Sequence, residues 1–270
     1  MYRFYFNCHH WKPTRDQWVY ANRCLPSREI QRIDEYAYER DVKFALIGQL
    51  LIRYLLSHVF QEKSSSFEIQ RTKSNRPYLK SNHLFDFNLS HHNQLVSIAG
   101  TFDGRIGCDT ILYQSNRLRQ ENYDLFRKKF TFDEFELIGR NPKNFYRLWS
   151  LKESYVKWLG IGIGFPLLRL NFHLQRENFS RNEIISDTIL RINQQLPSDK
   201  IRFDEQMIFL NDYDQQLITL CLSTTNPCQL FVELTIDDML HGCTPFDENK
   251  QEYFISWERF QTKRQTDIFS

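Results

Sequence analysis

Two acidic residues, Asp109 and Glu153, stand where a carboxylate could bind a metal ion or accept a proton. Asp109 interrupts an apolar stretch that predicts a strand, and a charge buried there is costly unless it has a partner. Glu153 shares one face of a predicted helix with Trp149 and Lys157, at spacings i, i+4 and i+8. Two carboxylates with open coordination positions suit Mg²⁺, which prefers oxygen ligands and often bridges to the phosphates of a substrate.

Each of these residues also has a simpler interpretation. Glu153 and Lys157 alone are typical of a surface ion pair, which contributes about 0.3–0.5 kcal/mol. Asp109 alone is typical of a turn or of a structural ion pair. Neither spacing nor composition brings Asp109 and Glu153 together, so a shared site needs a further argument.

The sequence predicts both helices and strands. Apolar residues at helical spacing predict one long helix or two consecutive helices over 27–59, and a capping box opens a short helix at 131–134. The helix that carries Glu153 is the best marked, because Asn141 precedes it, Pro142 begins it and Gly160 follows it. Strands are predicted over 1–6, 67–71, 95–102, 106–112, 168–174, 188–192, 201–210 and 217–222.

Polar segments separate these elements. The runs 71–77 and 88–93 are predicted to be loops, and Asp103-Gly104 predicts a hairpin between the strands on either side of it. The final residues, rich in Gln, Lys and Arg, are predicted to form a tail. Helices followed by strands, twice over, predict an α+β fold of two similar halves, 1–105 and 106–228, with a C-terminal extension over 229–270.

Composition excludes several classes of protein. The chain has 270 residues, of which 41% are hydrophobic, so it can build a packed core. Its net charge of +2 argues against a nucleic-acid binder. The six cysteines form no CxxC pair, and the most apolar run, 44–56, is shorter than the about 18 residues of a membrane span. We therefore expect a soluble protein of the cytosol, without a membrane segment.

The motifs around both acids resemble those of the surfactin-type 4′-phosphopantetheinyl transferases. That family carries a G-[IV]-D segment and, several tens of residues later, W-x-x-K-E-[SA]-x-x-K-x-x-G. Gly107-Cys108-Asp109 is similar to the first, and residues 149–160, WSLKESYVKWLG, match the second at every fixed position. Residues 88–92, NLSHH, are similar to the family's N-[IL]-S-H. The resemblance covers about residues 39–222 and is closest to the animal L-aminoadipate-semialdehyde dehydrogenase-phosphopantetheinyl transferase group.

The resemblance implies a specific reaction. Members transfer the phosphopantetheine arm of coenzyme A onto a serine of an apo acyl-carrier or peptidyl-carrier domain, as holo-[acyl-carrier-protein] synthases, and adenosine 3′,5′-bisphosphate leaves. The family fold is a pseudodimer of two α+β halves with the active site in the cleft between them. This duplication implies a monomer, because the cleft forms within one chain. The implied carriers are those of fatty-acid synthase and of enzymes of the aminoadipate reductase type.

The resemblance also implies roles for single residues. Asp109 and Glu153 would hold Mg²⁺ on the pyrophosphate of coenzyme A, with Glu153 the better candidate for general base toward the carrier serine. Lys157 would stabilise the transition state as a positive charge beside the phosphates. The implied ligands of coenzyme A include these three and also Arg40, Arg71, Lys73, Arg76, Asn88, Ser90 and His91. His92 has no counterpart in the motif and is expected to face solvent.

Three departures from the family pattern bear on the site. Ile111 stands where bacterial members usually carry a second acid, although animal-type members can also lack one, and a water or Gln94 could fill that metal position. Asn75-Arg76 replaces Gly-Lys in the basic loop, which keeps the charge but not the shape. Cys108 replaces the usual Ile or Val, and a small buried thiol is tolerable there.

Two other functions remain open at this stage. A non-catalytic relative that binds coenzyme A or a carrier domain needs no metal pair, so the retained Asp109, Glu153 and Lys157 argue against it. A Mg²⁺-dependent hydrolase of phosphoanhydrides could use the same two acids, but no nucleophile-activating cluster accompanies them.

Overall fold

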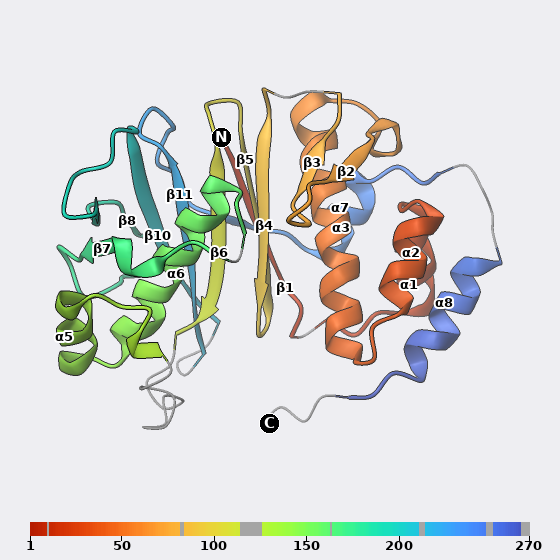
Figure 1. The fold of residues 1–270 in the computed structure, drawn as a ribbon. Helices are drawn as coiled ribbons and strands as arrows, with labels where there is room; N and C mark the ends of the chain where they lie inside the picture. Colours follow the sequence, from red (N-terminus) through yellow and green to blue (C-terminus); the bar gives the residue numbers. More distant parts are fainter. Residues whose placement is uncertain are drawn as a thin grey trace. The chain divides into compact units, whose positions relative to one another are not determined.

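The computed structural model describes residues 1–9, 11–81, 84–113, 126–162, 164–210, 214–246 and 251–265, which combine helices with several sheets (Figure 1). The predicted α+β class is therefore confirmed. The chain forms two compact units, which are Met1–Arg3, Ile69–Asn93 and Ala99–Phe231, and Phe4–Glu68, Gln94–Ile98 and Val232–Ser270. Two of the passages between them lie within strands, β1 (Tyr2–Asn7) and β5 (Leu95–Thr101). These units are defined by packing and combine separate stretches of the chain, so they do not test the predicted halves 1–105 and 106–228. The two similar halves with a site between them stay a prediction.

The first unit is built on an antiparallel sheet that holds Asp109. Its strand order is β6-β11-β10-β8, and Asp109 pairs with Thr219 of β11. The four strands are β6 (Ile106–Leu112), β8 (Ile184–Ile185), β10 (Ile201–Phe209) and β11 (Gln215–Ser223). Two smaller sheets pair β2 (Ile69–Arg71) with β3 (Pro77–Leu79), and β7 (Leu170–His173) with β9 (Ile189–Ile192).

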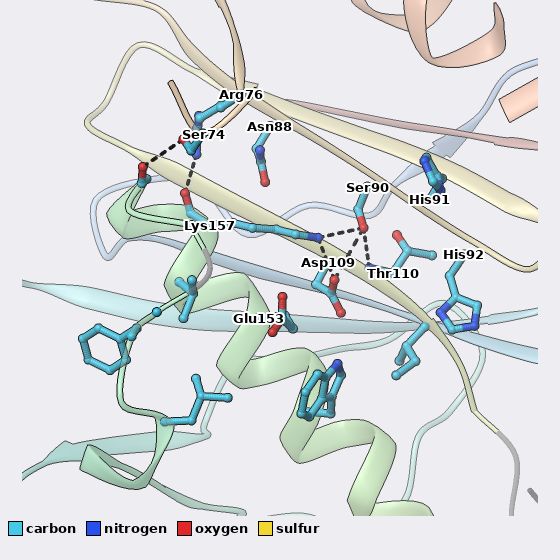
Figure 2. Close-up of a pocket in the computed structure, with 18 of the residues that line it drawn as sticks. Ser74, Arg76, Asn88, Ser90, His91, His92, Asp109, Thr110, Glu153 and Lys157 are labelled. Carbon is cyan, nitrogen blue, oxygen red and sulfur yellow. Dashed lines mark hydrogen bonds and ion pairs between the residues drawn. The ribbon is translucent and has the colours of Figure 1, made fainter. Parts of the chain in front are cut away.

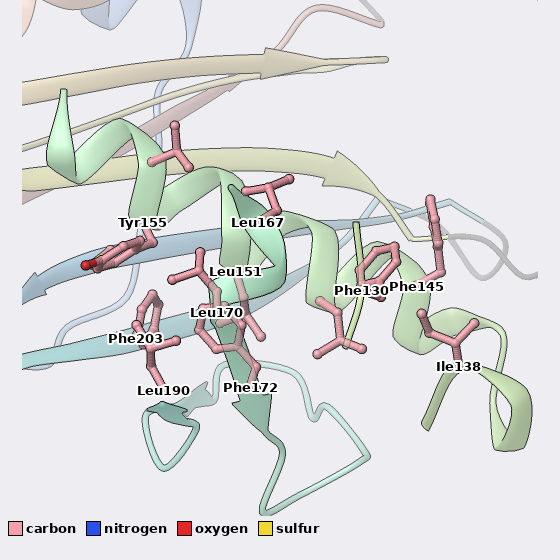
Figure 3. Packing of buried hydrophobic residues seen from close by; sticks show 13 residues of the cluster. Phe130, Ile138, Phe145, Leu151, Tyr155, Leu167, Leu170, Phe172, Leu190 and Phe203 are labelled. Carbon is pink, nitrogen blue, oxygen red and sulfur yellow. The ribbon is translucent and has the colours of Figure 1, made fainter. Parts of the chain in front are cut away.

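Helix α6 (Lys143–Leu159) carries Glu153 and packs across β6 and β11. It ends where the sequence predicts, because Gly160 adopts a left-handed conformation (φ 73°) that closes the last turn. The neighbouring α5 (Phe132–Arg140) is opened by the predicted capping box. Apolar side chains of both helices join those of β7, β9 and β10 in one core (Figure 3). Helix α6, which carries Glu153, is therefore held in place by a packed core of helices and strands.

The lysine that precedes Glu153 is buried in a network that holds α6 in place. Lys152 Nζ lies 2.8 Å from Glu134 Oε2 and donates to the carbonyls of Leu167 (3.0 Å) and Leu170 (2.7 Å). Burial lowers the pKa of Lys152, and the charge of Glu134 opposes that shift. Glu134 Oε1 accepts from the N–H of Phe172 at 3.0 Å. The network ties α6 to α5 and to the short 3₁₀ helix η2 (Leu167–Arg169) before β7.

Replacing Lys152 with Met is expected to destabilise the protein strongly, because the buried carboxylate of Glu134 loses its cation. The expected loss is about 3–5 kcal/mol in the free energy of unfolding, measured by urea denaturation. The double variant Lys152→Met/Glu134→Gln removes the unpaired charge as well and should recover part of the loss. A single variant within about 0.5 kcal/mol of wild type would contradict a structural role for Lys152.

Strand β4 (Asp86–His92) occupies most of a segment that the sequence predicts to be a loop, so that prediction is wrong. Its polar side chains are suited to a strand because every second one accepts a hydrogen bond from a backbone N–H of β6. The three pairs are Asp86 Oδ2 with Ile106 N–H (2.9 Å), Asn88 Oδ1 with Cys108 N–H (2.7 Å) and Ser90 Oγ with Thr110 N–H (3.1 Å). Side chains thus take the place of a backbone ladder along this edge of β6.

The hairpin predicted at Asp103-Gly104 is also wrong. Gly104 adopts the left-handed conformation of a turn (φ 78°), but β5 and β6 belong to different sheets. One edge of β6 pairs with β11, and its other edge receives the side chains of β4. The turn redirects the chain without pairing its two arms.

The second unit contains most of the helices. They are α1 (Arg15–Arg23), α2 (Ser27–Asp34), α3 (Glu39–Phe60), α7 (Ile236–Gly242) and α8 (Glu252–Gln261), with a short 3₁₀ helix, η1 (Ser64–Ser66). β1 pairs in parallel with β12 (Val232–Glu233). The region 27–59 thus forms two helices. The predicted tail is wrong for α8, because Tyr253, Ser256 and Phe260 bury one face of it.

Helix α3 is long and apolar enough, by length and composition alone, to cross a membrane. However, 67% of its most apolar stretch is buried within the protein. The buried residues include Arg53, whose Nη1 donates to the carbonyl of Ser64 at 2.6 Å. The core helix of a soluble protein meets the same criterion, so this helix is weak support for a membrane protein.

Candidate active site

A cavity of about 610 Å³ lies in the first unit, and it brings together seven of the residues predicted for the site (Figure 2). Its walls come from the basic loop after β2, from β4 and β6, and from α6 with the glycine-rich segment that follows it. The seven residues are Arg76, Asn88, Ser90, His91, Asp109, Glu153 and Lys157. The volume is in the range of small-molecule and cofactor sites.

Gly107 allows α6 to approach β6 closely. A Cβ atom at this position would lie 2.0 Å from the carbonyl oxygen of Ser154 and 2.4 Å from the backbone nitrogen of Trp158. Both atoms belong to the backbone of α6, so a side-chain adjustment could not make room. Asp109 is two residues further along β6 and points to the same face as Gly107. The G-x-D spacing therefore directs the carboxylate toward the helix that carries Glu153.

The carboxylate of Asp109 is paired with Lys157. Its Oδ1 lies 2.7 Å from Lys157 Nζ, which also donates to Ser90 Oγ at 3.0 Å. Only 10% of the Asp109 side chain and 29% of the Lys157 side chain are exposed. Figure 2 shows the three side chains converging from β6, α6 and β4. Partial shielding from water strengthens the attraction between the two charges.

Glu153 enters the same cavity from α6. Burial raises the pKa of its carboxyl group, the charge of Asp109 raises it further, and Lys157 acts in the opposite direction. Two carboxylates that repel each other in a half-buried cavity favour a cation beside them. Mg²⁺ is commonly held by one or two protein carboxylates and completes its shell with water and phosphate oxygens, so this donor set fits. Within the described ranges, no group of three or more His, Cys, Asp or Glu could hold a metal ion.

The basic residues predicted to bind coenzyme A are placed differently from one another. Arg76 lines the cavity, but its guanidinium donates to a carboxylate and to backbone carbonyls of the protein. Arg71 and Lys73, both in the described part of the chain, are not among the lining residues. Arg40 lies at the start of α3, in the second unit. The roles of these four toward coenzyme A stay predictions.

Asn75 explains why this chain tolerates the loss of the family's glycine in the basic loop. Its backbone is left-handed (φ 64°), a conformation that asparagine adopts more readily than most other residues. Its N–H donates to the carbonyl of Thr72 at 2.9 Å, which closes the turn between β2 and β3. Asn75 is therefore compatible with the turn that glycine favours at this position.

Among the basic residues that line the cavity, His92 and Lys129 were not predicted as site residues from the sequence. His92 is exposed, as expected, yet it lines the cavity, and no motif identifies it. Lys129 also lines it, and the basic run RKK at 127–129 was a signal that could have indicated this. Ile111, which departs from the second acid expected in bacterial members, also forms part of the wall. Gln94, considered as a replacement for that acid, belongs to the second unit.

The fold and the cavity agree with two family assignments. The description "4'-phosphopantetheinyl transferase, N-terminal" matches residues 9–103, and "4'-phosphopantetheinyl transferase superfamily" matches residues 105–221. Asp109, Glu153 and Lys157 all lie within the second match. The chain belongs to the 4′-phosphopantetheinyl transferase superfamily, as the motifs indicated.

Several curated relatives carry the name L-aminoadipate-semialdehyde dehydrogenase-phosphopantetheinyl transferase. The human relative is 32% identical over 70% of this chain and 65% of its own length. The relative from Schizosaccharomyces pombe is 30% identical over 63% of this chain and 76% of its own length. The relative from Xenopus laevis is 27% identical over 97% of this chain and 92% of its own length. The matched region thus spans slightly less than two thirds of the human protein.

Proposed function

We propose that this protein transfers the 4′-phosphopantetheine arm of coenzyme A onto a serine of apo acyl-carrier or peptidyl-carrier domains, as a holo-[acyl-carrier-protein] synthase. The observation that carries the proposal is the meeting of Asp109, Glu153 and Lys157 in one cavity of a chain that belongs to this family. A protein that only bound coenzyme A would need the lysine for its phosphates. It would not need a second carboxylate close enough to raise the pKa of Glu153.

Asp109 and Glu153 are the residues that would hold Mg²⁺. When bound, the ion would neutralise charge on the phosphoryl oxygens of coenzyme A and of the leaving bisphosphate. The support for this role is the donor set itself, because the charges of Asp109 and Glu153 are compensated in part by Lys157, which is paired with Asp109. A divalent cation would replace that partial compensation with a stronger one.

The side chains then have separate roles in the transfer. The carrier's serine oxygen bonds to the β-phosphorus of coenzyme A, and the bond from that phosphorus to the bridging oxygen breaks, so that adenosine 3′,5′-bisphosphate leaves. Glu153 accepts the serine proton, directly or through one water. Lys157 stabilises charge on the phosphates, with Ser90 and His91 as further donors.

The relatives' names direct the choice of carrier. They refer to an aminoadipate-semialdehyde dehydrogenase, so we propose the carrier domain of an aminoadipate reductase type of enzyme first and that of fatty-acid synthase second. We also propose that the protein acts in the cytosol as a monomer. The composition supports the cytosolic location, because the cysteines show neither CxxC pairs nor a disulfide framework.

The release of adenosine 3′,5′-bisphosphate tests the proposal. The protein is incubated with coenzyme A, Mg²⁺ and an apo carrier domain, and the nucleotide is quantified by chromatography. We expect one bisphosphate for each carrier and none with a carrier whose acceptor serine is changed to alanine. Release without an acceptor serine would indicate a hydrolase, and coenzyme A binding without release would indicate a non-catalytic relative.

A further inference from the structure

The C-terminal turn of α6 is held by side chains from outside the helix. The last carbonyls of a helix have no partners within it and must find them elsewhere. Arg76 Nη1 donates to the carbonyl of Lys157, and Arg105 Nη1 donates to that of Leu159 at 3.1 Å. Ser74 Oγ donates to the carbonyl of Gly160 at 3.3 Å. The backbone around Lys157 is therefore fixed by the basic loop and by Arg105, the residue before β6.

Arg76 also connects the C-terminal turn of α6 to strands β4 and β6. Its Nη2 donates to Asp86 Oδ2 (2.8 Å), to the carbonyl of Phe87 (3.0 Å) and to that of Ile106 (2.7 Å). Nη2 carries two hydrogens, and three acceptors share them. Only 13% of the Arg76 side chain is exposed. The guanidinium therefore links α6, β4 and β6 at the wall of the cavity.

Asp86 completes this link. The same Oδ2 atom that pairs with Arg76 accepts the N–H of Ile106 at 2.9 Å, in the first of the three bonds between β4 and β6. In the third bond of the series Ser90 Oγ accepts the N–H of Thr110, and the same Oγ accepts from Lys157 Nζ. A displacement of Arg76 would therefore affect both the backbone and the charged end of Lys157.

We propose that Arg76 is a positioning residue, which fixes Lys157 against Asp109 and Ser90 and does not itself bind the phosphates or the base of coenzyme A. The inference rests on the proposed transfer. It differs from the role implied by the family motif because the Nη2 hydrogens are engaged. If the guanidinium turned toward a phosphate, it would leave the carboxylate of Asp86 and the carbonyl of Lys157 without a partner, which is costly in a buried setting.

The test compares variants of Arg76 with variants of its partner Asp86. The carboxylate of Asp86 would repel a phosphate, so a loss of activity on changing Asp86 indicates positioning and not binding of coenzyme A. Arg76→Ala and Asp86→Ala should each lower kcat about 10–100-fold, with the KM for coenzyme A changed less than about 3-fold. The double variant should be no slower than the slower single variant, because both changes break one link. Arg76→Lys keeps the charge, but one ammonium cannot span these acceptors, so it should be slowed as well.

Dephospho-coenzyme A provides a second readout. A positioning role predicts the same fold-loss with coenzyme A and with this analogue, which lacks the 3′-phosphate. Arg140→Ala is the matched control, because this arginine is 72% exposed on α5 and pairs only loosely with Glu136, at 3.8 Å. The proposal would be overturned if Arg76→Ala raised the KM for coenzyme A about 10-fold or more and preserved kcat. In that case Asp86→Ala would behave like wild type, and Arg76→Lys would remain active.

Thermal unfolding separates this inference from the proposed function. If wild type transfers nothing, the proposed function fails, but the link between Arg76 and Asp86 can still be measured. The two single changes should lower Tm non-additively, and the Kd for coenzyme A in Arg76→Ala should differ from wild type by less than about 3-fold. Additive shifts in Tm, or a Kd weakened about 10-fold in Arg76→Ala alone, would contradict the positioning role.

Discussion

Changing Glu153 to Gln is expected to abolish transfer and, at the same time, to stabilise the metal-free protein. Transfer is lost because the amide can neither accept the serine proton nor hold a cation. The expected fall in kcat is about 10²–10⁴-fold. Stability rises because the wild-type carboxylate is desolvated and repelled by Asp109. An uncharged side chain of the same shape removes both costs.

The pH dependence of this stabilisation has a defined sign. The pKa of Glu153 is raised in the folded protein above its ordinary value of 4.5. Folding therefore disfavours the ionised form, and the stability deficit of wild type grows as the pH rises through the folded pKa. Below the pKa of the unfolded chain, Glu153 is protonated in both the folded and the unfolded protein, and the stability deficit vanishes. The gain in Tm of Glu153→Gln over wild type should be present at about pH 7 and absent near pH 4.

Scanning calorimetry at both pH values, with and without Mg²⁺, measures these effects. Mg²⁺ should raise the Tm of wild type and leave that of Glu153→Gln unchanged, because only wild type keeps both carboxylates. Glu136→Gln is the control, since this residue is 55% exposed on α5. A Glu153→Gln variant that keeps transfer within about tenfold of wild type, or that melts lower at neutral pH, would contradict the assigned role.

Changing Gly107 to Ala is expected to disrupt the site through the backbone. The added Cβ would lie 2.0 Å from the carbonyl oxygen of Ser154, so α6 must move away from β6. Overpacking of this kind costs about 1–3 kcal/mol, and a shift of about 1 Å between Asp109 and Lys157 can lower the rate about 10²-fold. Both the free energy of unfolding and kcat should therefore fall.

The same substitution at Gly139 provides a matched control. Gly139 lies in α5, and a Cβ there would meet no atom within 4 Å. Gly139→Ala should stabilise the helix by about 0.5–1 kcal/mol and leave transfer unchanged. Urea denaturation and initial rates of transfer compare the two variants. If Gly107→Ala behaved like Gly139→Ala, close approach of α6 to β6 would not explain the G-x-D motif.

The helices could be predicted from local signals because their ends are chemically marked. The capping box at Thr131 and the glycine at 160 act within one turn of chain, so the start of α5 and the end of α6 follow from the sequence. β4 could not be predicted in this way. Its polar residues suggest a loop until their partners, the N–H groups of β6, are known. Hydrogen bonds between distant segments leave no local pattern.

The site could be predicted from the sequence only through the family motif. Spacing placed Glu153 and Lys157 on one helical face, but it did not connect them to Asp109. The structure supplies the connection, because Gly107 lets the helix contact the strand and the Lys157–Asp109 distance is then 2.7 Å. For Arg76 the motif indicated a ligand of coenzyme A, whereas the structure shows bonds to Asp86 and to backbone carbonyls.

Intact-mass spectrometry of an apo carrier domain tests most directly whether Asp109, Glu153 and Lys157 form one transferase site. The carrier is incubated with coenzyme A, Mg²⁺ and wild type or the Asp109→Ala, Glu153→Gln or Lys157→Ala variant. Wild type should add about 340 Da to the acceptor serine, and the three variants should add little or nothing in the same time. No mass gain on any of several carriers, from a folded protein that binds coenzyme A, would contradict the assignment.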